Sequence, residues 1–267
     1  MSQKQDQTIL ITGASGSIAT HIVNDFLRAS NHVRGTVRSS AQGRADQGVQ
    51  GVIHTATPFQ IFGVEDNERD LLRPAIEGTE KILKAVLNFP SGVNRVVLTS
   101  SFAAMMDVSK GSWPGHVYSK IDWNPTPYEV AAAKDAPAVL GYSSAKALAE
   151  RAAWDFVNNE KPNFDIATIM PAMVHGPNIN ATVNLAKLNT PSSDNYRLIS
   201  PQSRPSDGVS QNMFWLFVDV RTGAVPSDVY TINNTKSQKV LGIQYHPLED
   251  TVVDAARSLL ELEGISV

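Results

Sequence analysis

The stretch that decides the fold is Thr8-Ile-Leu-Ile-Thr12-Gly13-Ala-Ser-Gly16-Ser-Ile-Ala19, near the start of the 267-residue chain. Residues 8–12 form a short apolar run, which predicts a buried strand. A glycine-rich turn follows, and apolar side chains then recur at helical spacing from residue 18 to residue 27. The stretch therefore predicts a strand, a tight turn and a helix in direct succession.

The alternation of strands and helices continues along the chain. Further strands are predicted at 33–37, 51–55, 95–99 and 164–170, and helices at about 65–88, 142–159 and 248–262. Such alternation predicts an α/β fold with a parallel sheet that is covered on both faces. Two stretches, roughly 102–141 and 172–235, have no clear periodicity, and we expect functional or mobile loops there.

Composition excludes several classes of function. The 23 basic and 26 acidic residues give a net charge of −3, so nucleic acid is a poor candidate partner. The absence of Cys excludes disulfides, Cys-ligated zinc and thiol catalysis. The His residues are scattered without metal-ligand spacing, so we expect no metal site. The polar start and the lack of an apolar run of about 20 residues predict a soluble, cytoplasmic protein without a membrane partner.

The turn after the first strand has the features of a dinucleotide-binding loop. Gly13 permits a tight turn, Gly16 lets the backbone approach a pyrophosphate, and the small Ala19 allows close packing of helix on strand. The helix N-terminus then presents free N–H groups and a partial positive charge to the phosphates. The residues predicted to line this loop are Gly13, Ser15, Gly16, Ser17 and Ile18. The alternative is an ordinary glycine turn, against which the strand before and the helix after count.

The end of the second strand discriminates between cofactors. A site for NAD places Asp or Glu there to bind the ribose 2′-hydroxyl, whereas an Arg accommodates a 2′-phosphate. Residues 33–39 contain no acid, and Arg38 follows the strand. We therefore predict NADPH (NADP+) as cofactor, the alternative being that Arg38 is a solvated surface residue.

A Tyr–Lys pair opens the long helix predicted from residue 142. The spacing of four between Tyr142 and Lys146 puts both side chains on one helical face. A nearby ammonium is expected to lower the pKa of the phenol, which could then donate a proton to a carbonyl oxygen. Ser100 and Ser101 directly follow the strand at 95–99, at the sheet edge where ligands of open α/β sheets bind. Either hydroxyl could bind the substrate oxygen, the alternative being an ordinary pair of serines at a strand end.

At this point the sequence resembles the extended short-chain dehydrogenase/reductases, in the branch of dihydroflavonol reductases, cinnamoyl-CoA reductases and fungal aldehyde (ketone) reductases. The motifs that carry the resemblance are residues 12–19, 33–38, 51–59, 96–101, 142–146 and 171–177. They occur in the order of the family and span nearly the whole chain.

The resemblance implies the fold, the roles of residues and the domain organisation. The fold would be a Rossmann-type doubly wound parallel sheet with a small C-terminal substrate-binding region. Residues 1–171 would bind the dinucleotide and carry the catalytic residues, and residues 172–267 would mainly bind substrate, with a strand and helices returning to the first domain. Ser101, rather than Ser100, would be the catalytic serine, Tyr142 the proton donor and Lys146 its partner. The residues implied to contact the cofactor, besides the loop and Arg38, are Thr55, Ala56, Tyr142, Lys146, Pro171 and Val174.

Two stretches are shorter than in the family. Only 13 residues separate Arg38 from Val52, where family members place a helix, a strand and a second helix. The missing strand would be the edge of the sheet, so its loss would make the second strand the new edge. A second shortfall follows Arg221, where the chain passes within a few residues to Tyr230. Either the protein truly lacks these units or the segments were lost from the sequence.

These observations predict an NADPH-dependent carbonyl reductase that acts on an aldehyde or ketone. An NAD-dependent sugar-nucleotide epimerase or dehydratase on the same fold is one alternative, and a non-catalytic dinucleotide-sensing protein is another. The retained Tyr–Lys pair counts against the second. The sequence does not distinguish a monomer from a homodimer, and it does not identify the carbonyl compound.

Overall fold

The computed structural model describes residues 6–36, 48–59, 63–88, 92–180, 183–200 and 228–265. Contacts between residues group the chain into two compact units. The first unit comprises Met1–Ser109 and Lys120–Ala172, and the second comprises Lys110–Ser119 and Met173–Val267.

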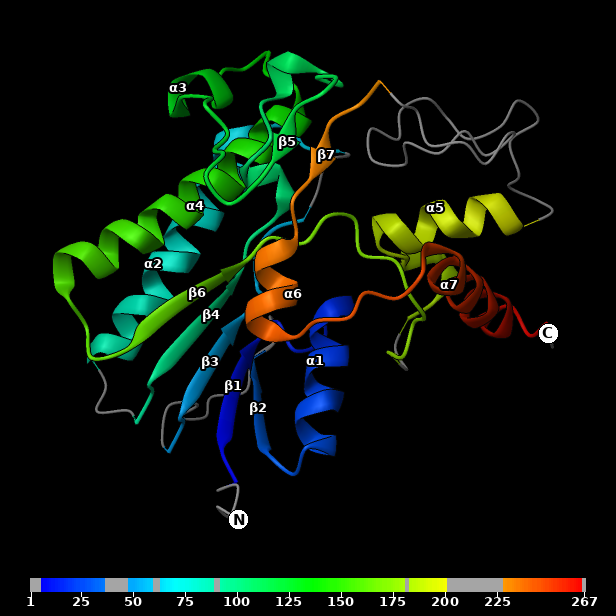
Figure 1. Cartoon of the computed structure of the whole chain (residues 1–267), viewed down its shortest axis with the longest axis horizontal. Coiled ribbons are helices and arrows are strands. Elements are labelled where there is room, and N and C mark those ends of the chain that lie inside the picture. The colour runs from blue at the N-terminus through cyan, green and yellow to red at the C-terminus, as the bar shows by residue number, and fades with distance from the viewer. Residues whose placement is uncertain are drawn as a thin grey trace. The chain divides into compact units, whose positions relative to one another are not determined.

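The first unit contains a five-stranded parallel sheet (Figure 1). Its strands are β1 (Thr8–Thr12), β2 (His32–Thr36), β3 (Gly51–His54), β4 (Arg95–Thr99) and β6 (Asp165–Ile169), in the spatial order β2-β1-β3-β4-β6. All four neighbouring pairs are parallel. The strands predicted from the sequence are therefore confirmed, with ends that differ by a residue or two.

Helices cover both faces of this sheet because successive apolar side chains of each strand point to opposite faces, which makes both faces apolar. On one face, α2 (Arg73–Asn88) and α4 (Ala138–Glu160) contribute Leu83 and Phe156 to a core cluster with Leu10, Val52 and Val96. On the other face, α1 (Ser17–Arg28) packs its apolar side against the remaining strand residues. The residues of that second cluster are Ile9, Ile11, Ala14, Ala19, Ile22, Val23, Phe26, Val33 and Ile53. The predicted Rossmann-type α/β sheet is confirmed.

The long helix α4 begins earlier than the sequence predicts. It starts at Ala138, behind Pro137, so Tyr142 lies one turn inside the helix and does not open it. Asn67 holds the preceding loop, because its Nδ2 donates to the carbonyl oxygens of Ala131 and Ala136 at 3.1 and 3.0 Å. A Cβ at Gly141 would lie 2.4 Å from Asn67 Cγ, so this approach requires glycine. The start of the helix is thus decided by a contact from a residue distant in the sequence.

The strand β2 is the edge of the described sheet, and β1 lies between β2 and β3. This is the arrangement that the shortfall after Arg38 predicts. The connection itself, residues 37–47, lies outside the described residues, as does the second shortfall after Arg221.

Residues 102–141, which were predicted as loop, contain several short elements. Some of them belong to the first unit and some to the second. These are the one-turn helices η2 (Phe102–Ala104) and η3 (Val108–Lys110), the strand β5 (Val117–Tyr118) and the helix α3 (Tyr128–Ala131). A further helix η1 (Glu68–Leu72) leads directly into α2. Within the described ranges, no helix is long and apolar enough to cross a membrane.

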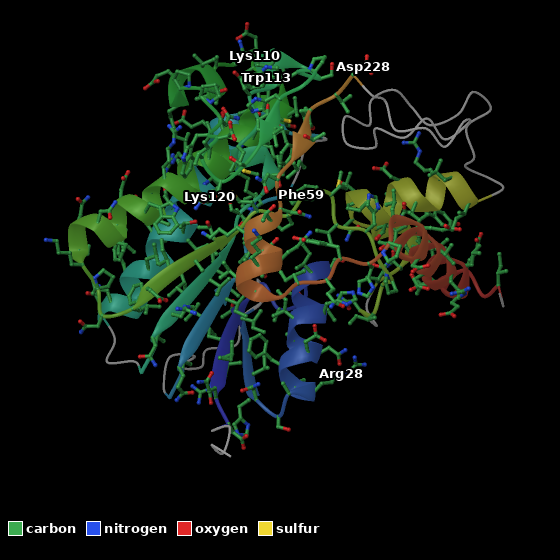
Figure 2. The ribbon with its side chains drawn as sticks, in the orientation of Figure 1. Arg28, Phe59, Lys110, Trp113, Lys120 and Asp228 are labelled. Carbon is green, nitrogen blue, oxygen red and sulfur yellow. The ribbon has the colours of Figure 1, made fainter. Side chains whose placement is uncertain are left out.

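The second unit pairs β5 with β7 (Thr231–Ile232) in parallel and contains η4 (Leu185–Lys187), α5 (Thr190–Ile199), α6 (Thr235–Leu241) and α7 (Leu248–Leu262). Aromatic rings hold the two strands together. Tyr118 is buried and makes edge-to-face contacts with Trp113 and Tyr230, at centroid distances of 5.8 and 5.0 Å. The Nζ of Lys110 lies 5.6 Å from the ring centroid of Trp113 (Figure 2). The sequence did not predict this small sheet.

Candidate active site

The glycine-rich turn joins β1 to α1 and lies against the chain that leaves β3. Gly13 has a φ of +67°, a conformation that side chains with a Cβ rarely adopt. A Cβ there would also lie 3.2 Å from the Cα of Ala56. The amide of Gly16 donates to the carbonyl of Gly13 at 2.8 Å, which closes the turn. The turn therefore brings the predicted loop residues and Ala56 together, as expected for a dinucleotide site.

The N-terminus of α1 is open to an anion. Its N-cap is Gly16, which has no side chain to cap the first amides, and the first turn contains no acidic residue. The free N–H groups and the helix dipole at such an end attract phosphate. The start of α1, at Ser17 and Ile18, thus fits the pyrophosphate of a dinucleotide.

Thr12 fastens the end of β3 to the end of β1. Its Oγ1 accepts from the amides of Thr55 and Ala56 at 3.1 and 3.2 Å. The hydroxyl of Thr55 donates in return to the carbonyl of Thr12. These bonds place Thr55 and Ala56 beside the glycine turn, where the family resemblance expects them to line the cofactor.

His54 is a buried neutral group behind this edge. Its Nδ1 lies 2.8 Å from Thr12 Oγ1. Because that oxygen already accepts two amide bonds, we assign its proton to the bond with Nδ1, which leaves the His54 proton on Nε2. Burial, reinforced by the positive charge of Lys146, lowers the pKa of His54 to about 4. The sequence had offered no role for this residue.

Ser101 and Tyr142 meet at the carboxyl edge of the sheet. Ser101 caps η2, its Oγ accepting from the amide of Ala103 at 3.1 Å, and it also hydrogen-bonds the phenol of Tyr142. Ser100 points elsewhere and donates to the carboxylate of Glu150. Of the two serines, Ser101 is the one placed beside Tyr142.

Lys146 lies one turn further along α4 than Tyr142. Its Nζ donates to the carbonyl of Thr99 at 3.4 Å and lies 5.9 Å from the ring centroid of Tyr142. Burial lowers the pKa of Lys146 to about 8, while the charge of Glu150 acts to raise it.

The expected lowering of the Tyr142 pKa is wrong for this structure. Burial raises the pKa of Tyr142 to about 12, and the bond from Ser101 offsets only part of that rise. The ammonium of Lys146 is directed at Thr99 and the ring face, so it does not compensate for the loss of water around the phenol. Tyr142 is therefore a protonated phenol at neutral pH.

Two residues of this site were missed by the sequence analysis. Phe59 makes an edge-to-face contact with Tyr142 at a centroid distance of 5.3 Å, and it is labelled in Figure 2. Glu150 is buried beside Ser100 and accepts a bond from Trp154 Nε1 at 3.4 Å. The signal for Glu150 was present, since it follows Lys146 by four residues, the spacing that relates Lys146 to Tyr142.

The structure does not bring every predicted residue to this edge. Pro171 belongs to the first unit, where its carbonyl accepts from the amide of Phe102 at 2.8 Å. Val174 belongs to the second unit, and its contact with a nicotinamide stays a prediction. Arg38, the candidate clamp for a 2′-phosphate, lies outside the described residues.

A glycine-rich turn that fits a dinucleotide and a Ser–Tyr–Lys group at the same edge of one parallel sheet are typical of the short-chain dehydrogenase/reductase class. Comparison with protein families narrows this class. The model of the 3-beta hydroxysteroid dehydrogenase/isomerase family matches residues 32–218. The chain belongs to that family.

Individual relatives agree with this assignment. An uncharacterized oxidoreductase of Schizosaccharomyces pombe is 34% identical over 257 residues, covering 85% of this chain and 74% of the relative. A ketoreductase of Aspergillus niger is 29% identical over 340 residues, covering 95% of this chain and 97% of the relative. The yeast methylglyoxal/isovaleraldehyde reductase, solved in complex with NADPH, is 26% identical with a TM-score of 0.78, covering 97% of this chain and 99% of that structure.

The alignment with the ketoreductase is longer than this chain. It extends over 340 positions, whereas the chain has 267 residues. The relative therefore carries residues that have no counterpart here, in agreement with the two shortfalls noted in the sequence.

Proposed function

We propose that this protein is an NADPH-dependent carbonyl reductase, which converts an aldehyde or a ketone into an alcohol. The observation that carries the proposal is the hydrogen bond between Ser101 and Tyr142, with Lys146 one turn away, at the sheet edge where α1 begins. The names of the relatives support it, because one is a ketoreductase and another is a methylglyoxal/isovaleraldehyde reductase complexed with NADPH.

The residues around the glycine turn fit the cofactor. A Cβ would fill the space at Gly13, and the N-terminus of α1 is uncapped. The residues that would hold NADPH are Gly13, Ser15, Gly16, Ser17, Ile18, Arg38, Thr55, Ala56, Tyr142, Lys146, Pro171 and Val174. When bound, NADPH supplies the hydride that reduces the carbonyl carbon.

Tyr142 would supply the proton. Its phenol is protonated at neutral pH, since its pKa is about 12, and Ser101 directs a hydroxyl toward the same place. As the substrate carbonyl is reduced, its oxygen becomes an alkoxide-like base and takes the Tyr142 proton. The ammonium of Lys146, on the next turn of α4, would then stabilise the phenolate that is left behind.

The second unit would supply the walls of the substrate pocket, and the protein would act in the cytoplasm. The first statement follows from the family resemblance, and the second is the expectation drawn above from the sequence. The oligomeric state, monomer or homodimer, does not enter the proposed chemistry, because Ser101, Tyr142 and Lys146 all lie in one unit of one chain.

The test is an assay of NADPH oxidation with a panel of aldehydes, ketones and 2-oxoaldehydes. We expect turnover of at least one class, and a loss of at least about 100-fold in kcat for Tyr142→Phe, because general acid catalysis contributes on that order. Tyr128→Phe is the matched control, since Tyr128 bonds Glu68 at the surface of the same unit, and it should keep full activity. Full activity in Tyr142→Phe would refute the mechanism.

Two other outcomes decide between the alternatives. Turnover of a sugar nucleotide with retained NAD would identify an epimerase or dehydratase. Binding of NADPH, measured by its fluorescence, without turnover of any compound would identify a dinucleotide-sensing protein.

A further inference from the structure

We propose that Glu150 is a positioning residue of this active site, whose buried carboxylate keeps Lys146 charged and in place beside Tyr142. The inference rests on the proposed function, because it concerns the residues that would protonate the substrate. It assigns a task to a buried acidic side chain that the mechanism above leaves unused.

Glu150 shares one face of α4 with the two predicted catalytic residues. Tyr142, Lys146 and Glu150 follow one another at intervals of four residues, which places their side chains one above the other. All three are buried, with exposed fractions of 7%, 8% and 6%. A Glu is rarely buried unless it is paired.

Each of the three side chains bonds a different residue at the end of β4. Lys146 Nζ donates to the carbonyl of Thr99, the hydroxyl of Ser100 donates to Glu150, and Ser101 hydrogen-bonds Tyr142. Thr99, the last residue of β4, and the two serines that follow it thus meet three consecutive turns of the helix. The bond to Glu150 holds the middle residue, so it fixes the strand end on which Ser101 sits.

The charges of Lys146 and Glu150 require each other. A buried carboxylate or ammonium costs free energy unless an opposite charge or several hydrogen bonds compensate. Glu150 has two neutral donors, Ser100 and Trp154, and Lys146 has one carbonyl acceptor at 3.4 Å. Burial lowers the pKa of Lys146, and the charge of Glu150 opposes that lowering.

Other titratable groups do not supply this charge. From β3, His54 faces Lys146 and is neutral, because burial lowers its pKa to about 4. In the described elements packed against α4, the remaining charged side chains lie at the surface. Ten of these side chains have an ion-pair or hydrogen-bond partner at the surface: Glu68, Arg69, Asp70, Arg73, Glu77, Glu80, Lys81, Lys84, Arg95 and Asp165. The others, on α3 and α4 themselves, are exposed: Glu129, Arg151, Asp155 and Glu160.

The first test is the pH dependence of kcat/KM for NADPH, which reports ionisations of the free enzyme. In Glu150→Gln, the loss of the opposite charge should lower the apparent pKa of the alkaline limb of this pH profile by about one pH unit or more. With the pKa of Lys146 at about 8 in the wild type, the fraction of the plateau kcat/KM that remains at pH 8 should be about fivefold smaller in Glu150→Gln than in the wild type. A side chain with a merely structural role would lower the plateau without moving the limb.

Two variants serve as controls. Glu160→Gln makes the same substitution at the exposed end of α4 and should leave the profile unchanged. Ser100→Ala removes a hydrogen bond but keeps the carboxylate, so it can lower the rate but should not move the limb. An alkaline limb in Glu150→Gln that coincides with the wild type would overturn the proposal.

The second test needs no substrate and also serves if Glu150→Gln folds poorly. Thermal unfolding is compared for Lys146→Met, Glu150→Gln and the double variant. Each single variant buries an uncompensated charge, so the double variant should lose less Tm than the sum of the single losses, and it should fold even where a single variant does not. A double variant that loses the full sum, or fails to fold, contradicts the pairing.

The two proposals fail separately. A wild-type protein that reduces no carbonyl compound with NADPH would refute the proposed function. The thermal cycle would still decide whether Glu150 and Lys146 depend on each other.

Discussion

The helix α4 and the segment 231–250 are opposite extremes of this protein. Eleven residues of α4 are buried, among them Tyr142, Lys146 and Glu150. Between residues 231 and 250, every residue is exposed except the half-buried Ser237, although the segment contains Val240, Leu241 and Ile243. Polar groups are buried where the chemistry is expected, and apolar groups are exposed where none is.

Local sequence alone therefore does not decide which side chains a segment buries. The helix α4 has neighbours on several sides, from α2, η1, η2, α3 and β6. The exposed segment follows the second shortfall, and relatives carry residues that this chain lacks. We expect the apolar side chains of α6 to pack only where such residues are present, because apolar surface gains free energy only when a neighbour covers it.

The largest expected effect is a difference in the free energy of unfolding between a substitution in the core beneath α4 and one in the exposed segment 231–250. Leu83→Ala empties a site in the core beneath α4, where Leu83 is fully buried, and should cost about 2–5 kcal/mol of the free energy of unfolding. Leu241→Ala, the same substitution at a side chain that is 58% exposed, should cost less than about 0.5 kcal/mol. Urea unfolding measures both. Equal losses would show that the apolar side chains of α6 are packed in solution.

The next effect concerns a buried histidine. Because the pKa of His54 is lowered from 6.5 to about 4 in the folded protein, the unfolded chain binds its proton first as the pH falls. The stability that neutral His54 contributes is fully present above pH 6.5 and is lost as the pH falls from 6.5 to about 4. Over that range the free energy of unfolding should fall by about 3 kcal/mol. In His54→Asn this part of the slope should be absent from unfolding curves recorded across that range.

His246→Asn is the matched control for the buried histidine, because His246 lies exposed in the segment 231–250. It should retain the wild-type slope. A His54→Asn variant with the same slope as this control would mean that His54 is not buried as a neutral group.

The smallest effect compares two glycines with the same backbone. Gly13 and Gly242 both have a φ of +67°, but a Cβ meets Ala56 at Gly13 and nothing within 4 Å at Gly242. Both Gly→Ala variants should lose about 1–2 kcal/mol of stability from backbone strain. Only Gly13→Ala should also bind NADPH more weakly, by about tenfold, in a fluorescence titration. Equal NADPH affinity in both variants would mean that the turn at Gly13 does not approach the cofactor.

Much of the first unit could be predicted from sequence because its signals are local. Apolar runs of four or five residues predicted the strands, and the order strand, glycine turn, helix predicted the loop at Gly13. The start of α4 was missed, since the bonds from Asn67 to Ala131 and Ala136 come from far along the chain. The sheet of β5 and β7 was missed because each strand has only two residues and depends on rings such as Tyr118 and Tyr230.

The site divides in the same way. The spacing of four named Tyr142 and Lys146, and the strand end named Ser100 and Ser101, because both patterns lie in short stretches of chain. The direction of the Tyr142 pKa was predicted wrongly, since the sequence shows which charge is near but not how much water is removed.

Local patterns in the sequence were enough to predict the parallel α/β fold, the glycine-rich turn that is expected to bind a dinucleotide, and the side chains expected to take part in catalysis. Only the tertiary structure decided which serine meets Tyr142, that His54 is buried as a neutral group, and that Glu150 lies against Ser100. The physical reason is that propensity and periodicity act between neighbours in the chain. Burial and electrostatic coupling depend instead on which distant residues share a low-dielectric interior.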